Sequence, residues 1–197
     1  METLISGDTE LDEESREGLG IIKNESIRLS AMVEDLLDFS KFSTGNIKLD
    51  MVDIDLNSLL SDIQKIVEPR TIRQNITLST DYPEQNCMIK ADEKRLKQIL
   101  FNLLDNSLKN TPGGGNITIG FRNITDSVEL YVEDTGCGIP EDELKEITGK
   151  FYVGKNQSTG SGLGLAIVEE IVQLHQWKLD ISSVLGSGTL VAIKIKP

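Results

Sequence analysis

The sequence predicts an α+β fold: a two-layer α/β sandwich of helices on mostly antiparallel strands, preceded by one long helix. Three observations lead to this fold class. Apolar residues recur at helical spacing through 93–110, and again after Gly164. Two pairs of short alternating runs, within 117–132 and 179–195, are each separated by turn residues, as in β-hairpins. A heptad-like repeat of apolar residues lies apart from both patterns, near the N-terminus.

The N-terminal segment, residues 12–44, is predicted to be the long helix. Acidic residues at 10–14 suit a first helical turn with Asp12 as candidate N-cap, although Gly18 and Gly20 weaken the helix locally. A helix packed on its own domain is one alternative. A lone helix cannot bury so wide an apolar stripe, however, so a helical bundle with a second chain is expected. The stripe consists of Leu19, Ile22, Leu29, Val33 and Leu36, widened by Met32, Leu37, Phe39 and Phe42.

A second domain is expected to follow a break at residues 43–46. The predicted boundaries are 1–44 for the helical segment, 45–50 for a linker or first strand, and 51–197 for the sandwich. Pro69 is expected to stop the first helix of the sandwich, and Asp92 to cap the second. The predicted strands are 47–54, 76–80, 88–91, 117–121, 128–132, 179–184 and 189–195; the predicted helices are 56–67, 93–110 and 165–172.

Composition and charge limit the function. The 197 residues, 38% of them apolar, can hold one good core and a smaller appendage. A net charge of −12 argues against a nucleic-acid partner. The sequence has no bilayer-length apolar stretch and no signal peptide, so we expect no membrane contact by this fragment and a cytoplasmic location, with any anchor elsewhere in a parent protein. Cys87 and Cys137 lack metal-ligand spacing; a reducing compartment is the simplest interpretation, although a bridge between them stays open.

Two glycine-rich stretches, D-T-G-C-G-I-P from Asp134 and T-G-S-G-L-G-L-A-I up to Ile167, suggest a nucleotide pocket. Asp134 should end a half-buried strand, where its carboxylate can accept hydrogen bonds from an amino group. Glycines beside it let the backbone approach a flat ligand, and those before the later helix leave its N-terminus open to a phosphate. Turn glycines are the alternative for either stretch alone. Neither G-x-x-x-x-G-K-[ST] nor G-x-G-x-x-G occurs, so the pocket is of another kind.

The helix 93–110 carries Asn102, Asn106 and Lys109 on one face, at spacings of four and three. Asparagine is a mediocre residue for a helix interior, so this face needs a reason. A carboxamide oxygen suits Mg²⁺, which takes few protein ligands and keeps waters and phosphate oxygens. Lys109 could then offset phosphate charge. The alternative is a solvated polar face on an amphipathic helix.

The motifs N-L-L-D-N-S-L-K-N-T, D-T-G-C-G-I-P, K-F-Y-V-G-K, G-S-G-L-G-L and G-S-G-T occur in this order. They resemble the N box, the first glycine box, the F box and the later glycine boxes of sensor histidine kinases. That family belongs to the GHKL, or Bergerat-type, ATPase superfamily, which includes gyrase and mismatch-repair proteins. The similarity covers about residues 47–197. Residues 12–44 resemble the second helix of the family's dimerisation and phosphotransfer domain.

The resemblance implies an ATP-binding catalytic domain that transfers the γ-phosphoryl group of ATP to a histidine, with Mg²⁺ as cofactor. Asp134 would contact the adenine amino group, Asn106 would hold Mg²⁺, and Asn102 and Lys109 would lie near the phosphates. It also implies two partners, a response regulator receiver domain and a second kinase protomer bound through helix 12–44. The other implied nucleotide-binding residues are Asn110, Gly136, Gly138, Ile139, Phe151, Tyr152, Lys155, Gly160, Ser161, Gly162, Leu163, Gly164, Leu165 and Thr189.

The sequence departs from the family's pattern at its phosphoacceptor. In the family this histidine lies on the first dimerisation helix, whereas the one histidine here, His175, follows the second glycine stretch. It is followed by Gln176 and Trp177 where the kinases usually have two glycines, so we expect a structural residue at a helix end. Residues 1–7 resemble the tail of the first helix, so the chain is expected to be a piece of a longer protein. Asn110 stands where an aromatic residue is common, which weakens the expected packing against adenine.

One position bears on the reaction type. Hydrolytic relatives place a glutamate one turn before the metal-binding asparagine as a general base, but here that residue is Asn102, which cannot take a proton. We therefore predict nucleotide binding with little hydrolysis and no self-phosphorylation. Two alternatives remain open: a nucleotide-binding and dimerisation module without transfer activity, and a superfamily serine kinase or ATPase. The dimerisation-like helix disfavours the serine kinase, and Asn102 disfavours the ATPase.

Overall fold

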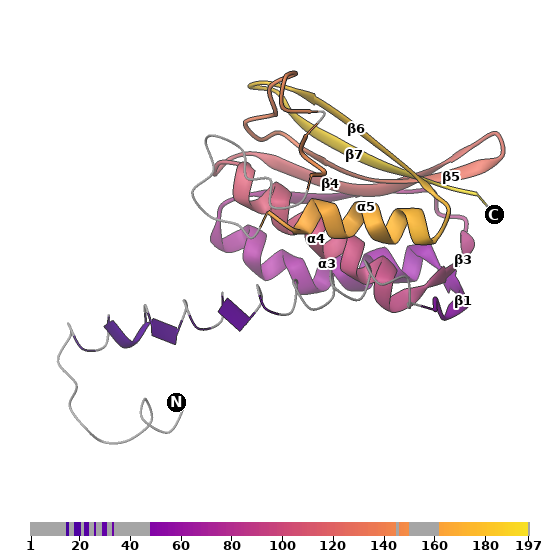
Figure 1. Cartoon of the computed structure of the whole chain (residues 1–197), viewed down its shortest axis with the longest axis horizontal. Helices are drawn as coiled ribbons and strands as arrows, with labels where there is room; N and C mark the ends of the chain where they lie inside the picture. The colour runs from indigo at the N-terminus through magenta and orange to yellow at the C-terminus, as the bar shows by residue number, and fades with distance from the viewer. Residues whose placement is uncertain are drawn as a thin grey trace.

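The computed structural model describes residues 15, 18–20, 22, 23, 26, 29, 30, 33, 48–144, 146–149 and 162–196. Its helices and strands form two layers, with α3, α4 and α5 together on one side of a curved sheet (Figure 1). This arrangement confirms the predicted two-layer α+β sandwich. In chain order the elements are β1 (Met51–Asp55), α3 (Leu56–Arg73), β2 (Thr77–Asp81), β3 (Met88–Asp92), α4 (Glu93–Asn110), β4 (Asn116–Ile124), β5 (Ser127–Asp134), α5 (Gly164–Leu174), β6 (Lys178–Val184) and β7 (Gly188–Ile195).

The main sheet has the strand order β2-β4-β5-β7-β6. Its β4–β5, β5–β7 and β6–β7 pairs are antiparallel, and the β2–β4 pair is parallel. The first strand, β1, instead pairs with β3 in a separate two-stranded antiparallel sheet. Asp134 is the last residue of the central strand β5, so the sequence places this carboxylate at the end of the sheet, as predicted.

The core lies between the helices and the sheet. In α4 the apolar residues at helical spacing are all buried, and they face the alternating apolar side of β4 and β5. Each fully buried leucine or isoleucine contributes about 1.5–3 kcal/mol relative to an exposed one. This layer therefore holds α4 firmly against the strand that carries Asp134. The α4 residues concerned are Leu96, Ile99, Leu100, Leu103, Leu104 and Leu108.

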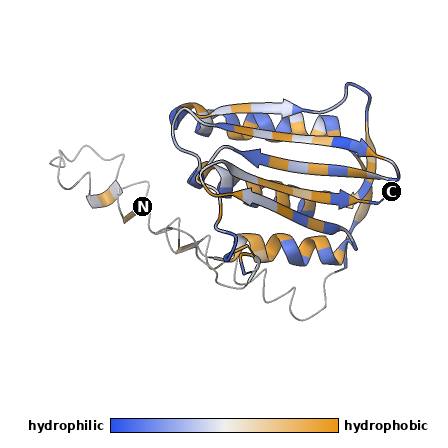
Figure 2. Cartoon of the chain, turned by 90° about the horizontal axis from the view of Figure 1, so that it is seen from above, coloured by the Kyte–Doolittle hydropathy of each residue, from blue (hydrophilic) through white to orange (hydrophobic). Residues whose placement is uncertain are grey.

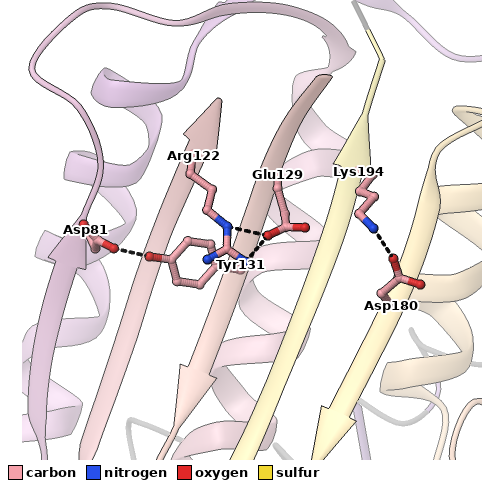
Figure 3. Close-up of polar contacts among 6 residues, drawn as sticks. All are labelled: Asp81, Arg122, Glu129, Tyr131, Asp180 and Lys194. Carbon is pink, nitrogen blue, oxygen red and sulfur yellow. Dashed lines mark hydrogen bonds and ion pairs between the residues drawn. The ribbon is translucent and has the colours of Figure 1, made fainter. Parts of the chain in front are cut away.

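Two side chains on the open face of the sheet are buried, although no helix among the described residues covers this face (Figure 2). Figure 2 shows strands with mixed hydropathy on this face and helices behind them. Glu129 and Tyr131 point to this side of β5, yet they are only 7% and 6% exposed. Tyr131 lies over Gly120, where a Cβ would come within 2.9 Å of the ring, and its hydroxyl donates to Asp81 on the edge strand β2 (Figure 3). Arg122 lies 5.5 Å from the Tyr131 ring centre and pairs with Glu129.

The predicted end of the first helix of the sandwich is wrong. α3 continues through Pro69 to Arg73, with Asp55 as its N-cap. Pro69 has no N–H for the carbonyl of Lys65, but both residues are exposed, so water can satisfy that carbonyl. Beyond the proline, Thr71 is buried and keeps the helix packed on the core. The other elements agree with prediction to within a few residues, except that β1 begins at Met51 rather than residue 47.

The positions described between residues 15 and 33 are helical, as predicted, and they include Gly18 and Gly20. Ile22, Leu29 and Val33 of the predicted stripe are 54%, 60% and 55% exposed. Met32, Leu36, Leu37, Phe39 and Phe42 lie outside the described residues, so bundle formation stays a prediction. Within the part of the chain that the structure describes, no helix is both long and apolar enough to cross a bilayer. Cys87 and Cys137 are both free thiols.

Candidate functional site

The carboxylate of Asp134 is fixed by two donors at the end of β5. Its Oδ2 accepts a 2.9 Å hydrogen bond from the hydroxyl of Ser107 on α4, and its Oδ1 accepts one of 2.9 Å from the backbone N–H of Gly136. The residue is 8% exposed. A carboxylate has about four lone-pair positions, so these two bonds orient Asp134 and leave it able to accept from a ligand amino group. No sequence motif singled out Ser107, although a buried serine inside an apolar helix face is a signal of such a role.

The glycine turn after Asp134 packs directly on the end of α4. Cys137 N donates to the carbonyl of Asn110 at 3.1 Å, and a Cβ on Gly136 would lie 2.6 Å from that same oxygen. Gly138 has a φ of +66°, in the left-handed region that favours glycine. The turn and the helix end together border an open cavity of about 450 Å³. Its lining residues are Lys109, Asn110, Thr111, Pro112, Thr135, Gly136, Cys137 and Gly186.

The predicted asparagine face of α4 meets the start of α5. A Cβ on Gly164, the first residue of α5, would lie 3.8 Å from Oδ1 of Asn102 and 4.0 Å from Oδ1 of Asn106. The first turn of a helix has N–H groups without intrahelical acceptors, and the N-cap residue Leu163 makes no side-chain cap bond to them. The structure thus brings the two predicted carboxamides and a helix N-terminus close together.

The donor set around Gly164 fits a magnesium ion carried with phosphate. Asn102 Nδ2 is buried without a hydrogen-bond partner, so an acceptor such as a phosphate oxygen would satisfy it. Over the described ranges, no group of three or more histidine, cysteine, aspartate and glutamate side chains could hold a metal. A metal here would therefore bind few protein oxygens. Mg²⁺ tolerates this arrangement because waters and phosphates complete its octahedron.

Thr189 lies next to Asp134. The two residues are direct partners across β5 and β7, so their side chains share the helix-facing side of the sheet. Ile139, after the glycine turn, is half-buried, and its N–H donates to Ser183 Oγ at 2.8 Å. Gly162 has a φ of +67°, and Leu163 is 2% exposed. Phe151, Tyr152, Lys155, Gly160 and Ser161 lie outside the described residues, so their predicted roles stay predictions.

His175 lies at the far end of α5, away from Gly164. It is the C-cap of the helix, which confirms the predicted structural position. Its Nε2 accepts from the backbone N–H of Asp92 at 3.1 Å, and its Nδ1 lies 2.9 Å from the carbonyl of Ile171. Because an N–H can only donate, Nε2 carries no proton and Nδ1 donates to Ile171. Burial lowers the pKa of His175, which favours this neutral ring.

Comparison with known protein families identifies a shared domain. Residues 91–197 match the model of a family described as histidine kinase-, DNA gyrase B-, and HSP90-like ATPase. The alginate biosynthesis sensor protein KinB of Pseudomonas aeruginosa is 32% identical over 177 residues, or 89% of this chain and 30% of KinB. The sensor histidine kinase WalK of Bacillus subtilis is 30% identical over 201 residues, or 99% of this chain and 33% of WalK. The chain thus spans about a third of the length of each relative.

Solved structures agree with these relatives. Full-length ShkA in complex with AMPPNP superposes with a TM-score of 0.82 and 28% identity, over 95% of this chain and 40% of ShkA. The catalytic domain of histidine kinase ThkA gives a TM-score of 0.68 at 27% identity, over 75% of this chain and 96% of that domain. ThkA in complex with the response regulator protein TrrA gives a TM-score of 0.77 at 25% identity, over 95% of this chain and 53% of that chain.

Proposed function

Because this chain belongs to the family of histidine kinase-, DNA gyrase B- and HSP90-like ATPases, we propose that it is the ATP-binding catalytic domain of a two-component sensor histidine kinase. KinB and WalK are sensor proteins by name, and ShkA was solved with AMPPNP, an ATP analogue. The reaction is transfer of the γ-phosphoryl group of ATP to a histidine on a separate dimerisation helix.

The observation that carries the proposal is that residues of α4 contribute to both ends of one site. At one end, Ser107 and Gly136 orient the carboxylate of Asp134, which suits an adenine amino group. At the other end, Asn102 and Asn106 face the first residue of α5, which suits phosphates. One rigid helix thus spaces the base and phosphate contacts, because its packed face is buried in the core.

Each phosphate-end residue has a distinct role in this proposal. Asn106 holds Mg²⁺ through its carboxamide oxygen, and the ion offsets the phosphate charge when bound. Lys109, in the last turn of α4, adds a positive charge near the phosphates. Asn102 donates to a phosphate oxygen through the amide group that has no protein partner. Since Asn102 cannot take a proton from water, the site binds ATP without activating water for hydrolysis.

The phosphoryl acceptor must come from outside the described fold. A histidine nitrogen attacks the γ-phosphorus while the bond to the bridging oxygen breaks and ADP leaves. His175 is unsuited to this attack, because it is buried at 8% exposure and both of its ring nitrogens are hydrogen-bonded. A second protomer, bound through helix 12–44, and a response regulator receiver domain are the partners that we propose. ThkA was solved with the regulator TrrA, which supports a partner of that kind.

A transfer experiment tests the proposal. The chain is incubated with Mg²⁺ and γ-labelled ATP, together with a separate polypeptide that carries a histidine-bearing dimerisation helix. We expect acid-labile label on the supplied polypeptide and none on the chain itself. Asp134→Asn should abolish the transfer, whereas Asn123→Asp, an exposed change on β4, should not. Label on His175, or nucleotide binding without any transfer, would contradict the kinase assignment.

A further inference from the structure

Three residues form a row across the end of the sheet, next to the glycine turn. Asp134 on β5 pairs directly with Thr189 on β7, and Thr189 pairs directly with Ser183 on β6. Directly opposite residues point to the same face of a sheet, so the three side chains are successive neighbours on the helix-facing side. No sequence motif singled out Ser183, and its partners lie five or more residues away along the chain.

The hydroxyl of Ser183 contacts three polar groups. Its Oγ lies 2.8 Å from the N of Ile139, 2.8 Å from the carbonyl oxygen of Gly188 and 2.9 Å from Oγ1 of Thr189. The Ile139 N–H can only donate and the Gly188 carbonyl can only accept. The one proton of Ser183 therefore goes to Gly188, and Thr189 must donate its own proton to Ser183. All three contacts are hydrogen bonds only with this arrangement of protons.

This arrangement fixes what Thr189 presents to its other neighbours. With its proton directed at Ser183, Oγ1 of Thr189 offers lone pairs alone, and it lies beside the carboxylate of Asp134, which also only accepts. Two adjacent acceptors favour a ligand edge that carries N–H donors. The 6-amino group of a purine has two such donors, whereas the oxygen of a 6-oxo purine has none and would face two acceptors.

Ser183 also holds the glycine turn in place. The backbone of the turn after β6 contacts the backbone of the glycine turn. Gly186 N donates to the Cys137 carbonyl at 2.7 Å, and a Cβ on Gly138 would lie 2.1 Å from the Val184 carbonyl oxygen. The bond from Ile139 to Ser183 adds a side-chain contact at the end of this junction. A shift of Ser183 would therefore move the turn that supplies the Gly136 N–H to Asp134.

We propose that Ser183 is a positioning residue that sets the preference for 6-amino over 6-oxo purine nucleotides, by fixing the proton of Thr189 and the glycine turn. This inference rests on the proposed function, because it places the purine at Asp134. It assigns the specificity to a residue that does not itself touch the base.

Nucleotide selectivity tests the inference. The affinities of ADP and of inosine 5′-diphosphate, the 6-oxo counterpart, are measured by calorimetry. The ratio of the ADP affinity to the inosine 5′-diphosphate affinity is then compared between variants. Ser183→Ala frees the Thr189 proton to turn toward a 6-oxo group, so the ratio should fall about tenfold, the value of roughly one hydrogen bond. Ser183→Thr keeps the hydroxyl and should restore the ratio. Ser182→Ala, at the exposed neighbouring position, should leave the ratio unchanged.

The outcomes separate the two proposals. If the parent chain binds neither nucleotide, the proposed function fails. If it binds ADP but Ser183→Ala weakens both nucleotides equally, or neither, Ser183 is merely structural and the inference is overturned while the function stands. Should circular dichroism show Ser183→Ala to be unfolded, Ser183→Cys replaces it, since a thiol of similar size is a poor donor and acceptor. A lowered ratio supports the inference, and an unchanged ratio overturns it.

Discussion

The hydroxyl of Ser107 donates a 2.9 Å hydrogen bond to Oδ2 of Asp134, and this bond joins the last turn of α4 to the end of β5. Both residues are buried, at 5% and 8% exposure. Ser107 directly follows Asn106, so the helix that presents the phosphate end of the proposed site also orients the carboxylate at the base end. Rigid spacing between the two ends follows from this one contact and from the core packing of α4.

Ser107→Ala should therefore weaken nucleotide binding without removing any proposed ligand contact. We expect the ADP affinity to fall about tenfold, since a hydrogen bond to a charged group contributes about 1.5 kcal/mol or more. Calorimetric titration with ADP measures this. Ser79→Ala, an exposed serine on β2, is the matched control and should bind as the parent does. An unaltered ADP affinity in Ser107→Ala would show that Asp134 needs no support from α4.

Asn106→Asp probes the metal end of the site. The new carboxylate adds negative charge where the ATP phosphates are proposed to lie, so Mg²⁺-dependent ATP affinity should be lost. We expect the affinity to fall about tenfold or more, because the repulsion of one pair of like charges is of that order. The affinity is measured with Mg²⁺ and with a chelator. Asn123→Asp makes the same charge change on an exposed strand end. If Asn106→Asp kept the full magnesium dependence, Asn106 would not belong to the site.

Some of the fold could be predicted from local signals alone. The bounds of α4 match the predicted 93–110, because Asp92 caps the helix by accepting from Arg95 N at 3.0 Å and the apolar period is unbroken. Pro69 misled the prediction, since whether a missing N–H is tolerated depends on the exposure of a carbonyl four residues earlier. The burial of Tyr131 could not be predicted either. It depends on Gly120, a cross-strand partner whose register no local pattern reveals.

The candidate site, like the fold, could be predicted only in part from the sequence. The glycines and Asp134 were found because their residue types and order are rare together. The residues that orient them were not, because Ser107 and Ser183 are ordinary serines whose partners Asp134 and Ile139 lie 27 and 44 residues away in sequence. A hydrogen bond between distant segments leaves no trace in a single sequence. Such supporting contacts become visible only once the strand register is known.

His175→Gln should alter the pH dependence of stability. Burial lowers the folded-state pKa of His175 below its ordinary 6.5, and the nearby Asp92 carboxylate opposes this in part. The unfolded chain therefore binds more protons, so the stabilisation is present above the ordinary pKa and is lost as the pH falls below it. Urea unfolding at about pH 7.5 and about pH 5.5 measures the change. We expect the parent to lose stability over this range and the variant to lose less.

The Asp92 carboxylate titrates outside the pH range of that comparison. The pKa of Asp92 is lowered from 3.8, despite its burial, by bonds from the Asp50 and Arg95 N–H groups. Its contribution is thus lost only at pH values well below those used for His175. If the variant lost as much stability as the parent between the two pH values, the folded-state pKa of His175 would not be lowered by burial.

Tyr131 should govern stability at the opposite end of the pH scale. Burial, followed by the hydrogen bond to Asp81, raises its pKa from 10.0 to about 12. The protonated phenol is favoured in the folded state, so its stabilisation is complete below pH 10 and is lost as the pH rises toward 12. Tyr131→Phe should remove this alkaline loss. At neutral pH it should cost about 1 kcal/mol, because the Asp81 carboxylate loses a donor.

An ultraviolet titration of tyrosinate tests this directly, since the chain has three tyrosines. The parent should show a late step, and Tyr131→Phe should lack it. Tyr82→Phe is the matched control: Tyr82 stacks on Phe121 with ring centres 5.7 Å apart, and removing its hydroxyl should leave the late step in place. If the late step survived in Tyr131→Phe, the phenol of Tyr131 would titrate as an ordinary surface tyrosine. The bond from Tyr131 to Asp81 would then not hold the edge strand β2 to the centre of the sheet.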